Sequence, residues 1–417
     1  MNKTVFFILA LALGLTAAGQ SYTFVDYQEA VLRGNLDLAA ERLNVDVAQA
    51  DVSAAKIKQD PSVSVGYDNN SDWAIAMGQA CSVEISKPIS LGKVSARSQV
   101  ARHMLGASEA SLLHYLNNLK ADASLAFLDA LLARDKAELT KQTYDYMRTL
   151  YEGDCLRLEK GDISPLDVMQ SQLETVLAQQ EWQAAVTDYA NARLVLDNLA
   201  GQPARGTVSV EGQLSAITQV FDLPTLVSQA VSNRPDVVAA LRESDASESQ
   251  VVLTRRERMP DFELSAAVGY NTRVRNEEAP APQFVGYSVG LSVPLPLSTF
   301  NRAEVRSSAL QAQQAQIHVQ SVQAAVRTEV MQAYNSYEAA RLRVEDYSSL
   351  LLSQSQQVLD GKLYAYRRGE TSLLDLLNAQ HTYNQVRQAY AEILHDCMSA
   401  YVELMRACGI SDYTLGI

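Results

Sequence analysis

Two short segments carry a glycine, a serine and an aspartate at the same spacing, and their residue types define the chemistry open to this chain. The first set is Gly161, Ser164 and Asp167, and the second is Gly369, Ser372 and Asp375. A glycine suits the left-handed position that ends a helix, and a serine suits the cap that begins the next helix. An aspartate in the first turn then stabilises the positive end of the helix dipole. The expected chemistry is therefore electrostatic.

Side chains that usually carry catalysis or bind metals are not grouped along the sequence. The histidines are His103, His114, His318, His381 and His395, and the cysteines are Cys81, Cys155, Cys397 and Cys408. Neither set has metal-ligand spacing. Buried thiols are the expectation for the cysteines, although an oxidising compartment would allow a disulfide. The sequence has no phosphate loop and no nucleophile elbow, so we expect no enzyme, no cofactor and no metal site.

The charge balance argues against one class of partner. The chain has 417 residues, 20% of them charged, and a formal net charge of −13 at pH 7. A strongly negative chain is a poor partner for nucleic acid, whereas a negative, water-filled interior would favour cations or neutral solutes.

The N-terminus has the features of an export signal. Lys3 precedes an apolar run from Val5 to Leu15, and small residues follow up to Gly19. This pattern predicts a signal peptide over residues 1–19. No cysteine lies near the expected cut, so a lipid-anchored amino terminus is not expected.

Very long helices dominate the rest of the chain. Residues 302–366 contain no proline and one glycine. Their apolar positions follow a heptad seam made of Val326, Val330, Ala333, Tyr337, Ala340, Val344, Tyr347 and Leu351. We expect a second long helix over residues 93–158. Each long helix should be followed, after a turn, by a helix that runs back alongside it, over residues 164–199 and 372–407. About 60 residues make a rod of roughly 90 Å, which no compact domain of this size holds.

Four short segments alternate between apolar and small polar residues. They form two pairs, at about 62–87 and 261–294, joined by polar loops. After residue 20 no apolar run is long enough for a membrane helix, so any membrane crossing would use these strands. Tyr67, Trp73 and Tyr270 would then suit an interfacial girdle. The alternative is a small soluble sheet capping the helices.

Four strands cannot close a channel by themselves, and an open strand edge is not tolerated in lipid. The membrane interpretation therefore requires an oligomer. Two protomers would supply about eight strands, which fill with side chains, and three would supply about twelve, which leave a lumen. A conducting protein would be a trimer.

The two halves repeat one another about 200 residues apart. We expect a first repeat over 20–200, a connecting segment over 201–222, a second repeat over 223–408 and a tail over 409–417. The fold class is mainly α with a small β part, with long antiparallel coiled-coil helices.

The ordered duplicate resembles the TolC outer-membrane efflux family. The resemblance rests on the paired turns ending at Gln172 and Gln380, on Asn233–Asp236, and on the proline at the strand entry, Pro260. The stretch Val293–Leu297 with Asn301 and Arg302 looks most like the cation-efflux branch. The family implies a homotrimer with a twelve-stranded β-barrel in the outer membrane of a Gram-negative bacterium and an α-helical barrel in the periplasm. Its partners would be a periplasmic adaptor protein and an inner-membrane RND-type pump.

The resemblance also implies where the functional residues lie. The periplasmic entrance and gate would involve Asp167, Asp375, Asn378, Tyr366 and Thr371. The turns at Gly161, Ser164, Gly369 and Ser372 would dock the adaptor. Asn378 and Thr371 stand where some members carry a second acid and a basic partner, so closure is expected to use hydrogen bonds and packing rather than an ionic latch.

Three questions stay open at this level. A periplasmic coiled-coil scaffold or adaptor without a pore is the alternative from another class, and a type I secretion duct is the alternative within the channel class. Metal cations are the favoured cargo, with drugs second.

Overall fold

The computed structural model describes residues 21–70, 76–203, 208–294, 302–347 and 349–416. The predicted signal peptide over residues 1–19, the aromatic Trp73 and most of the Val293–Leu297 motif, together with Asn301, lie outside these residues.

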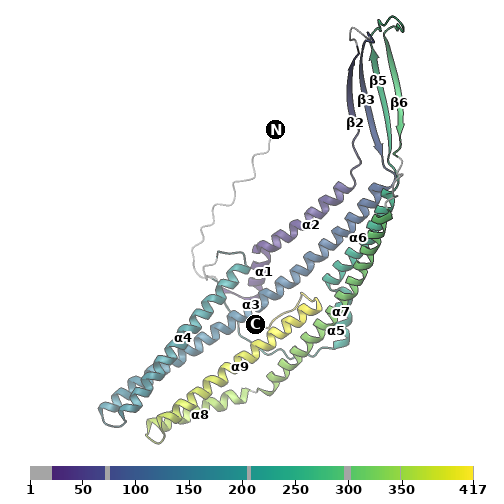
Figure 1. The fold of residues 1–417 in the computed structure, drawn as a ribbon. Coiled ribbons are helices and arrows are strands. Elements are labelled where there is room, and N and C mark those ends of the chain that lie inside the picture. Colours follow the sequence, from purple (N-terminus) through teal and green to yellow (C-terminus); the bar gives the residue numbers. More distant parts are fainter. Residues whose placement is uncertain (1–20, 71–75, 204–207, 295–301, 348, 417) are drawn as a thin grey trace. The chain divides into compact units, whose positions relative to one another are not determined.

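The described elements run in the same order in both halves of the chain, with one exception (Figure 1). The first half contains α1 (Phe24–Gly34), α2 (Leu36–Ala55), β2 (Ser62–Asn69), β3 (Gln79–Ile89), α3 (Lys93–Glu159) and α4 (Pro165–Leu199). The second half contains α5 (Leu223–Asn233), α6 (Pro235–Glu257), β5 (Phe262–Asn271), β6 (Phe284–Ser292), α7 (Arg302–Asp346), α8 (Ser349–Arg367) and α9 (Leu373–Cys408). The exception is that α7 and α8 of the second half stand where the first half has the single helix α3. Two short strands, β1 (Ser21–Tyr22) and β4 (Ser209–Val210), pair in parallel.

The chain divides into two compact units, each taking segments from both repeats. The hairpin unit comprises the described residues up to Ala40, His114–Arg234 and those from Ala325 onward. The sheet unit comprises Glu41–Leu113 and Pro235–Ala324. The compact units therefore do not coincide with the sequence repeats, because the long helices α3 and α7 each contribute to both.

The sheet unit carries one antiparallel sheet in the order β2-β3-β5-β6. Its register places the apolar residues of all four strands on one face, for example Val65 opposite Val83 and Val83 opposite Val268. The exposed apolar residues of this face are Val63, Val65, Tyr67, Val83, Ile85, Ile89, Leu264, Val268, Tyr270, Val285, Tyr287, Val289 and Leu291, and Phe284 is exposed on the other face. Serines and glycines such as Ser82, Gly269 and Gly286 share the other face. A soluble sheet buries its apolar face and exposes its polar face to water, whereas this sheet exposes its apolar face.

Four of the eight predicted seam positions are fully buried, and three others are half-buried. Val326, Val330, Tyr337 and Ala340 are all at most 1% exposed. The prediction of one helix over 302–366 is wrong, because α7 ends at Asp346 and α8 begins at Ser349. Leu351, beyond the break, is exposed.

Among the described residues, no helix combines the length and apolar character that a membrane span needs. All four cysteines are free thiols. The expectation of buried thiols is confirmed for Cys397 and Cys408, but it is wrong for Cys81, which is exposed, and Cys155 is half-buried.

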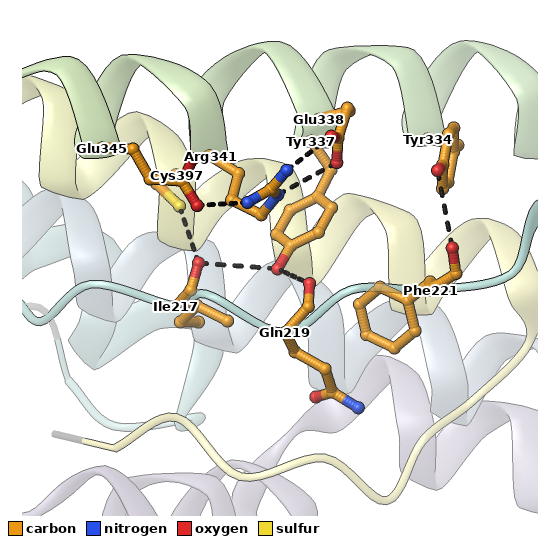
Figure 2. A network of polar contacts seen from close by, with 9 residues as sticks. All are labelled: Ile217, Gln219, Phe221, Tyr334, Tyr337, Glu338, Arg341, Glu345 and Cys397. Carbon is orange, nitrogen blue, oxygen red and sulfur yellow. Dashed lines mark hydrogen bonds and ion pairs between the residues drawn. The ribbon is translucent and has the colours of Figure 1, made fainter.

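The connecting segment after β4 lies along α7 and α9 in the hairpin unit (Figure 2). The Tyr337 hydroxyl donates to the carbonyl oxygen of Gln219 at 2.6 Å, and the Tyr334 hydroxyl reaches that of Phe221 at 3.5 Å. The Phe221 ring packs against Tyr337 and Tyr401 at centroid distances of 5.6 and 6.2 Å. Aromatic packing and hydroxyl donors together fix an otherwise irregular segment on the helices.

Candidate functional site

The two predicted turns have nearly the same backbone geometry. Gly161 has a φ of 79° and Gly369 a φ of 73°. The amide of Gly161 donates to the Leu158 carbonyl at 2.9 Å, and that of Gly369 to the Tyr366 carbonyl at 3.0 Å. The next amides donate to carbonyls five residues back, at Arg157 and Ala365. Both helices therefore end in the Schellman arrangement that favours glycine.

Each return helix begins with the predicted serine cap. Ser164 and Asp167 form a reciprocal capping box, with the Ser164 hydroxyl 2.8 Å from Asp167 Oδ2. Asp375 Oδ2 accepts the hydroxyls of both Thr371 and Ser372 at 2.9 Å. The two aspartates thus stabilise the first turns of α4 and α9.

Alanine at two glycines of the same hairpin should have opposite effects on stability. In the described part of the chain, no heavy atom outside the local backbone lies within 4 Å of a Cβ added at Gly369 or at Gly361. Gly369→Ala should cost about 1–2 kcal/mol because its φ is left-handed. Gly361→Ala lies inside α8 and should instead stabilise by roughly 0.5–1 kcal/mol. Guanidinium unfolding followed by circular dichroism measures both changes, and equal shifts of one sign would contradict the turn geometry.

Tyr366 joins the two hairpins of the unit. Its hydroxyl donates to Asp154 Oδ1 at 2.8 Å, which links α8 to α3 across 212 residues of sequence. The Arg157 guanidinium lies over the Tyr366 ring, 4.8 Å from its centroid. Asp154 is 1% and Tyr366 5% exposed, so the contact is shielded from water.

Apolar packing surrounds this contact. Its buried cluster consists of Met147, Ala178, Leu359, Tyr366, Leu373, Leu376, Leu377 and Ala379. The cluster draws on α3, α4, α8 and α9, so both hairpins share one small core. A polar pair inside such a core is sensitive to any separation of the hairpins.

The acids of this region have pKa values shifted in opposite directions. Burial raises the pKa of Asp154, outweighing the opposing effect of the Tyr366 hydrogen bond. Asp154 Oδ2 is buried and forms no hydrogen bond of normal geometry among the described residues, although the Ser171 hydroxyl lies near enough to lower the pKa of Asp154. The hydroxyls of Thr371 and Ser372 lower the pKa of Asp375, which is exposed. Burial also raises the pKa of Tyr146 to about 12. Asp154 is thus the acid whose charge is least favoured.

The structure brings some of the predicted residues together and leaves others apart. Tyr366 is buried in the shared core, while Asp375 and Asn378 are exposed on α9. The Thr371 hydroxyl donates its hydrogen bond to the Asp375 carboxylate. Within the described residues, no group of three or more His, Cys, Asp or Glu could hold a metal ion.

Asp154 and Arg157 were not among the predicted site residues. A signal for Asp154 is present, because Tyr144, Met147, Tyr151 and Asp154 continue one helical face at steps of three, four and three. An acid on an apolar seam is a candidate for a buried polar contact. Its partner could not be read from the spacing.

Comparison with known proteins identifies the family. Residues 27–202 and 226–410 match the family described as outer membrane efflux protein, and the chain belongs to it. Its relatives include the cobalt-zinc-cadmium resistance protein CzcC of Cupriavidus metallidurans, 23% identical over 90% of this chain and 87% of the relative. Another is the outer membrane efflux protein BepC of Brucella suis, 24% identical over 90% and 83%.

A solved structure supports the same fold. The outer membrane protein VceC of Vibrio cholerae matches with a TM-score of 0.73 at 19% identity, covering 93% of this chain and 96% of that one. The mainly helical fold with four antiparallel strands is therefore that of TolC-like channels.

Family membership answers the main functional question. The chain is an outer membrane efflux channel of tripartite systems, with a periplasmic extension, and the family is not enzymatic. Its members form trimers with adaptor and pump partners. The poreless scaffold considered above is therefore set aside.

Proposed function

We propose that this chain forms a homotrimeric exit duct whose periplasmic entrance is held closed by the contact between Tyr366 and Asp154. The observation that carries the proposal is this hydrogen bond, which joins the hairpin α3–α4 to the hairpin α8–α9 within a shared buried core. Opening the entrance would separate the hairpins and expose the pair to water.

Unpartnered surfaces of the chain support the homotrimer. Leu166, Met169, Leu173 and Leu177 form an exposed stripe on α4 at steps of three, four and four. Leu36, Leu43 and Val47 form a similar stripe on α2. Apolar stripes at heptad spacing need a partner helix, and a neighbouring copy of the chain would supply one.

The sheet supports the same assembly. Its edge strands β2 and β6 have no further strand beside them among the described residues. Pairing β6 of one copy with β2 of the next in three copies would give a closed twelve-stranded barrel. The exposed apolar face would then meet lipid, and the serine-rich face would line the lumen.

Metal cations are the cargo we favour, and drugs are second. One relative is named for cobalt, zinc and cadmium resistance. The acid at Asp375 is exposed, and its lowered pKa keeps it ionised. Three copies around an axis would give a ring of charge that attracts cations. The turns at Gly161, Ser164, Gly369 and Ser372 would meet a periplasmic adaptor, and an inner-membrane RND-type pump would supply the cargo.

Asp375→Asn should lower the cation preference of the channel. The amide keeps an oxygen for Thr371 and Ser372 but removes three charges from the proposed ring. Coulomb energies in water predict a roughly two- to tenfold fall in the cation-to-anion permeability ratio at low salt. Reversal potentials of the purified trimer in planar bilayers measure this ratio.

The matched control is Glu181→Gln, which also removes three exposed charges from the trimer, one from the middle of each α4. It should leave the permeability ratio unchanged. An unchanged ratio in Asp375→Asn would contradict the acidic ring, and a monomeric mass in mild detergent would contradict the trimer.

A further inference from the structure

A basic pocket lies within the sheet unit, between the end of α2, the end of β3 and the first turns of α3. Its volume is about 850 Å³, and its basic lining residues are Lys56, Lys58, Lys87, Arg102 and His103. Among the residues that the structure describes, no Asp or Glu lines it. Such a concentration of positive charge is unexpected in a chain with a net charge of −13.

The charges of this pocket are largely uncompensated. In the part of the chain that the structure describes, no ion pair involves Lys56, Lys58, Lys87 or Arg102. His103 lies 3.8 Å from Asp245, and the neighbouring Lys93 pairs with Asp261 at 2.9 Å. Four exposed cations therefore line one cavity, and a bound anion would relieve the part of their mutual repulsion that solvent does not screen.

The surrounding structure holds the pocket walls in place. Arg97 donates to the carbonyl oxygens of Ala55 and Ile57, at 3.3 and 2.9 Å, and so fixes the segment that carries Lys56 and Lys58. Arg256 donates to the carbonyl oxygen of Gly92 at 2.6 Å, which fixes the turn between β3 and α3. The cations are thus presented by a supported backbone rather than by a loose loop.

The pocket continues the apolar face of the sheet. Lys87 pairs with Leu264 in the register, two residues beyond Ile85 on the same face of β3. Ile89, two residues further, is exposed and lines the pocket. In Figure 1 the ends of α2, α3 and α6 meet this end of the sheet. Acyl chains lying on the apolar face would place their headgroups at Lys87.

We propose that this pocket binds the phosphate headgroup of an anionic phospholipid in the periplasmic leaflet of the outer membrane. Clustered lysine and arginine beside a membrane-facing apolar surface favour anionic lipids. Ile85 and Ile89 give the lipid an apolar contact that free phosphate lacks, which favours the lipid as the source of the anion. The inference rests on the membrane location of the family and is independent of the gate and of the cargo.

The test measures lipid binding by the full-length protein, purified and delipidated in a neutral detergent. Native mass spectrometry follows titration with dioleoyl phosphatidylglycerol and, separately, with dioleoyl phosphatidylcholine. The wild type should prefer phosphatidylglycerol. Each cation near a membrane surface changes affinity roughly fivefold, so Lys87→Gln with Arg102→Gln should weaken phosphatidylglycerol binding about 25-fold.

The matched control is Lys136→Gln with Lys141→Gln, which removes two exposed lysines from α3 outside this pocket. It should bind phosphatidylglycerol like the wild type. Equal losses in both double variants, or equal affinity of the wild type for the two lipids, would overturn the proposal. Displacement of bound phosphatidylglycerol by millimolar inorganic phosphate would overturn the assignment to a lipid.

Discussion

Tyr366→Phe is expected to convert a mostly closed channel into one that conducts for a much larger fraction of the time. The substitution removes only the hydroxyl that donates to Asp154 and keeps the ring beneath Arg157. A hydrogen bond to an ionisable group contributes about 1.5–3 kcal/mol. Losing it from the closed state alone should raise the ratio of open to closed channels roughly 10- to 100-fold.

Single-channel recordings in planar bilayers measure the conducting fraction directly. Tyr364→Phe is the matched control, because Tyr364 is an exposed tyrosine of the same helix with Arg368 over its ring at 4.6 Å. It should behave like the wild type. A conducting fraction in Tyr366→Phe equal to that of Tyr364→Phe would remove Tyr366 from the gate.

In the same recordings, the conducting fraction should depend on pH through the protonation of Asp154. Burial raises the pKa of this carboxyl in the closed tip, and hydration on opening would return it to the ordinary range. Proton binding therefore favours the closed state, so acidification through the raised pKa should lower the conducting fraction. Asp154→Asn should abolish that dependence. A conducting fraction that rises on acidification would contradict burial as the dominant cause.

Arg234→Met is expected to give the largest loss of stability. The Arg234 side chain is 8% exposed and joins three helices. It donates to the Ala407 carbonyl oxygen at 2.8 Å and pairs with Glu329 at 2.8 Å. Gly409, in the turn that ends α9, lies against it; a Cβ there would come within 3.0 Å of Arg234 Cγ.

The cost follows from what the substitution leaves behind. Glu329 is 46% exposed and can regain water, but Ala407 is buried and its carbonyl would lose a charged donor. We expect a loss of about 2–4 kcal/mol per subunit. Guanidinium unfolding followed by far-ultraviolet circular dichroism measures it.

Arg242→Met is the control for this experiment. Arg242 is 51% exposed and lies 3.6 Å from Asp245, a surface pair of the kind that contributes about 0–1 kcal/mol. Equal shifts in the two variants would show that Arg234 is no more than another surface cation.

Most of the fold could be predicted from the sequence because its signals are local. The alternating segments became four strands, the heptad positions of α7 became a buried seam, and each Gly-Ser-Asp turn became a Schellman end followed by a serine cap. Each of these depends on residues within about one or two turns of each other, so spacing alone specifies them. The break after Asp346 was missed because no proline or glycine marks it in the sequence.

Only some residues of the candidate site could be predicted from the sequence. Tyr366 was singled out by the family resemblance, but Asp154 was not recognised as its partner, and Arg234 was included only within the stretch Asn233–Asp236 that carries the resemblance. Both contacts join residues far apart in the chain: Tyr366 with Asp154, and Arg234 with Ala407.

The sequence by itself determined the elements, their caps and the duplicated order of the two halves. Only the tertiary structure decided which polar groups are buried together, which cations share a pocket and which sheet face is exposed. The physical reason is that helix and strand periodicity is a short-range property of the backbone. Burial, and with it the strength of a hydrogen bond or the pKa of an acid, depends on whatever distant segment packs against the residue.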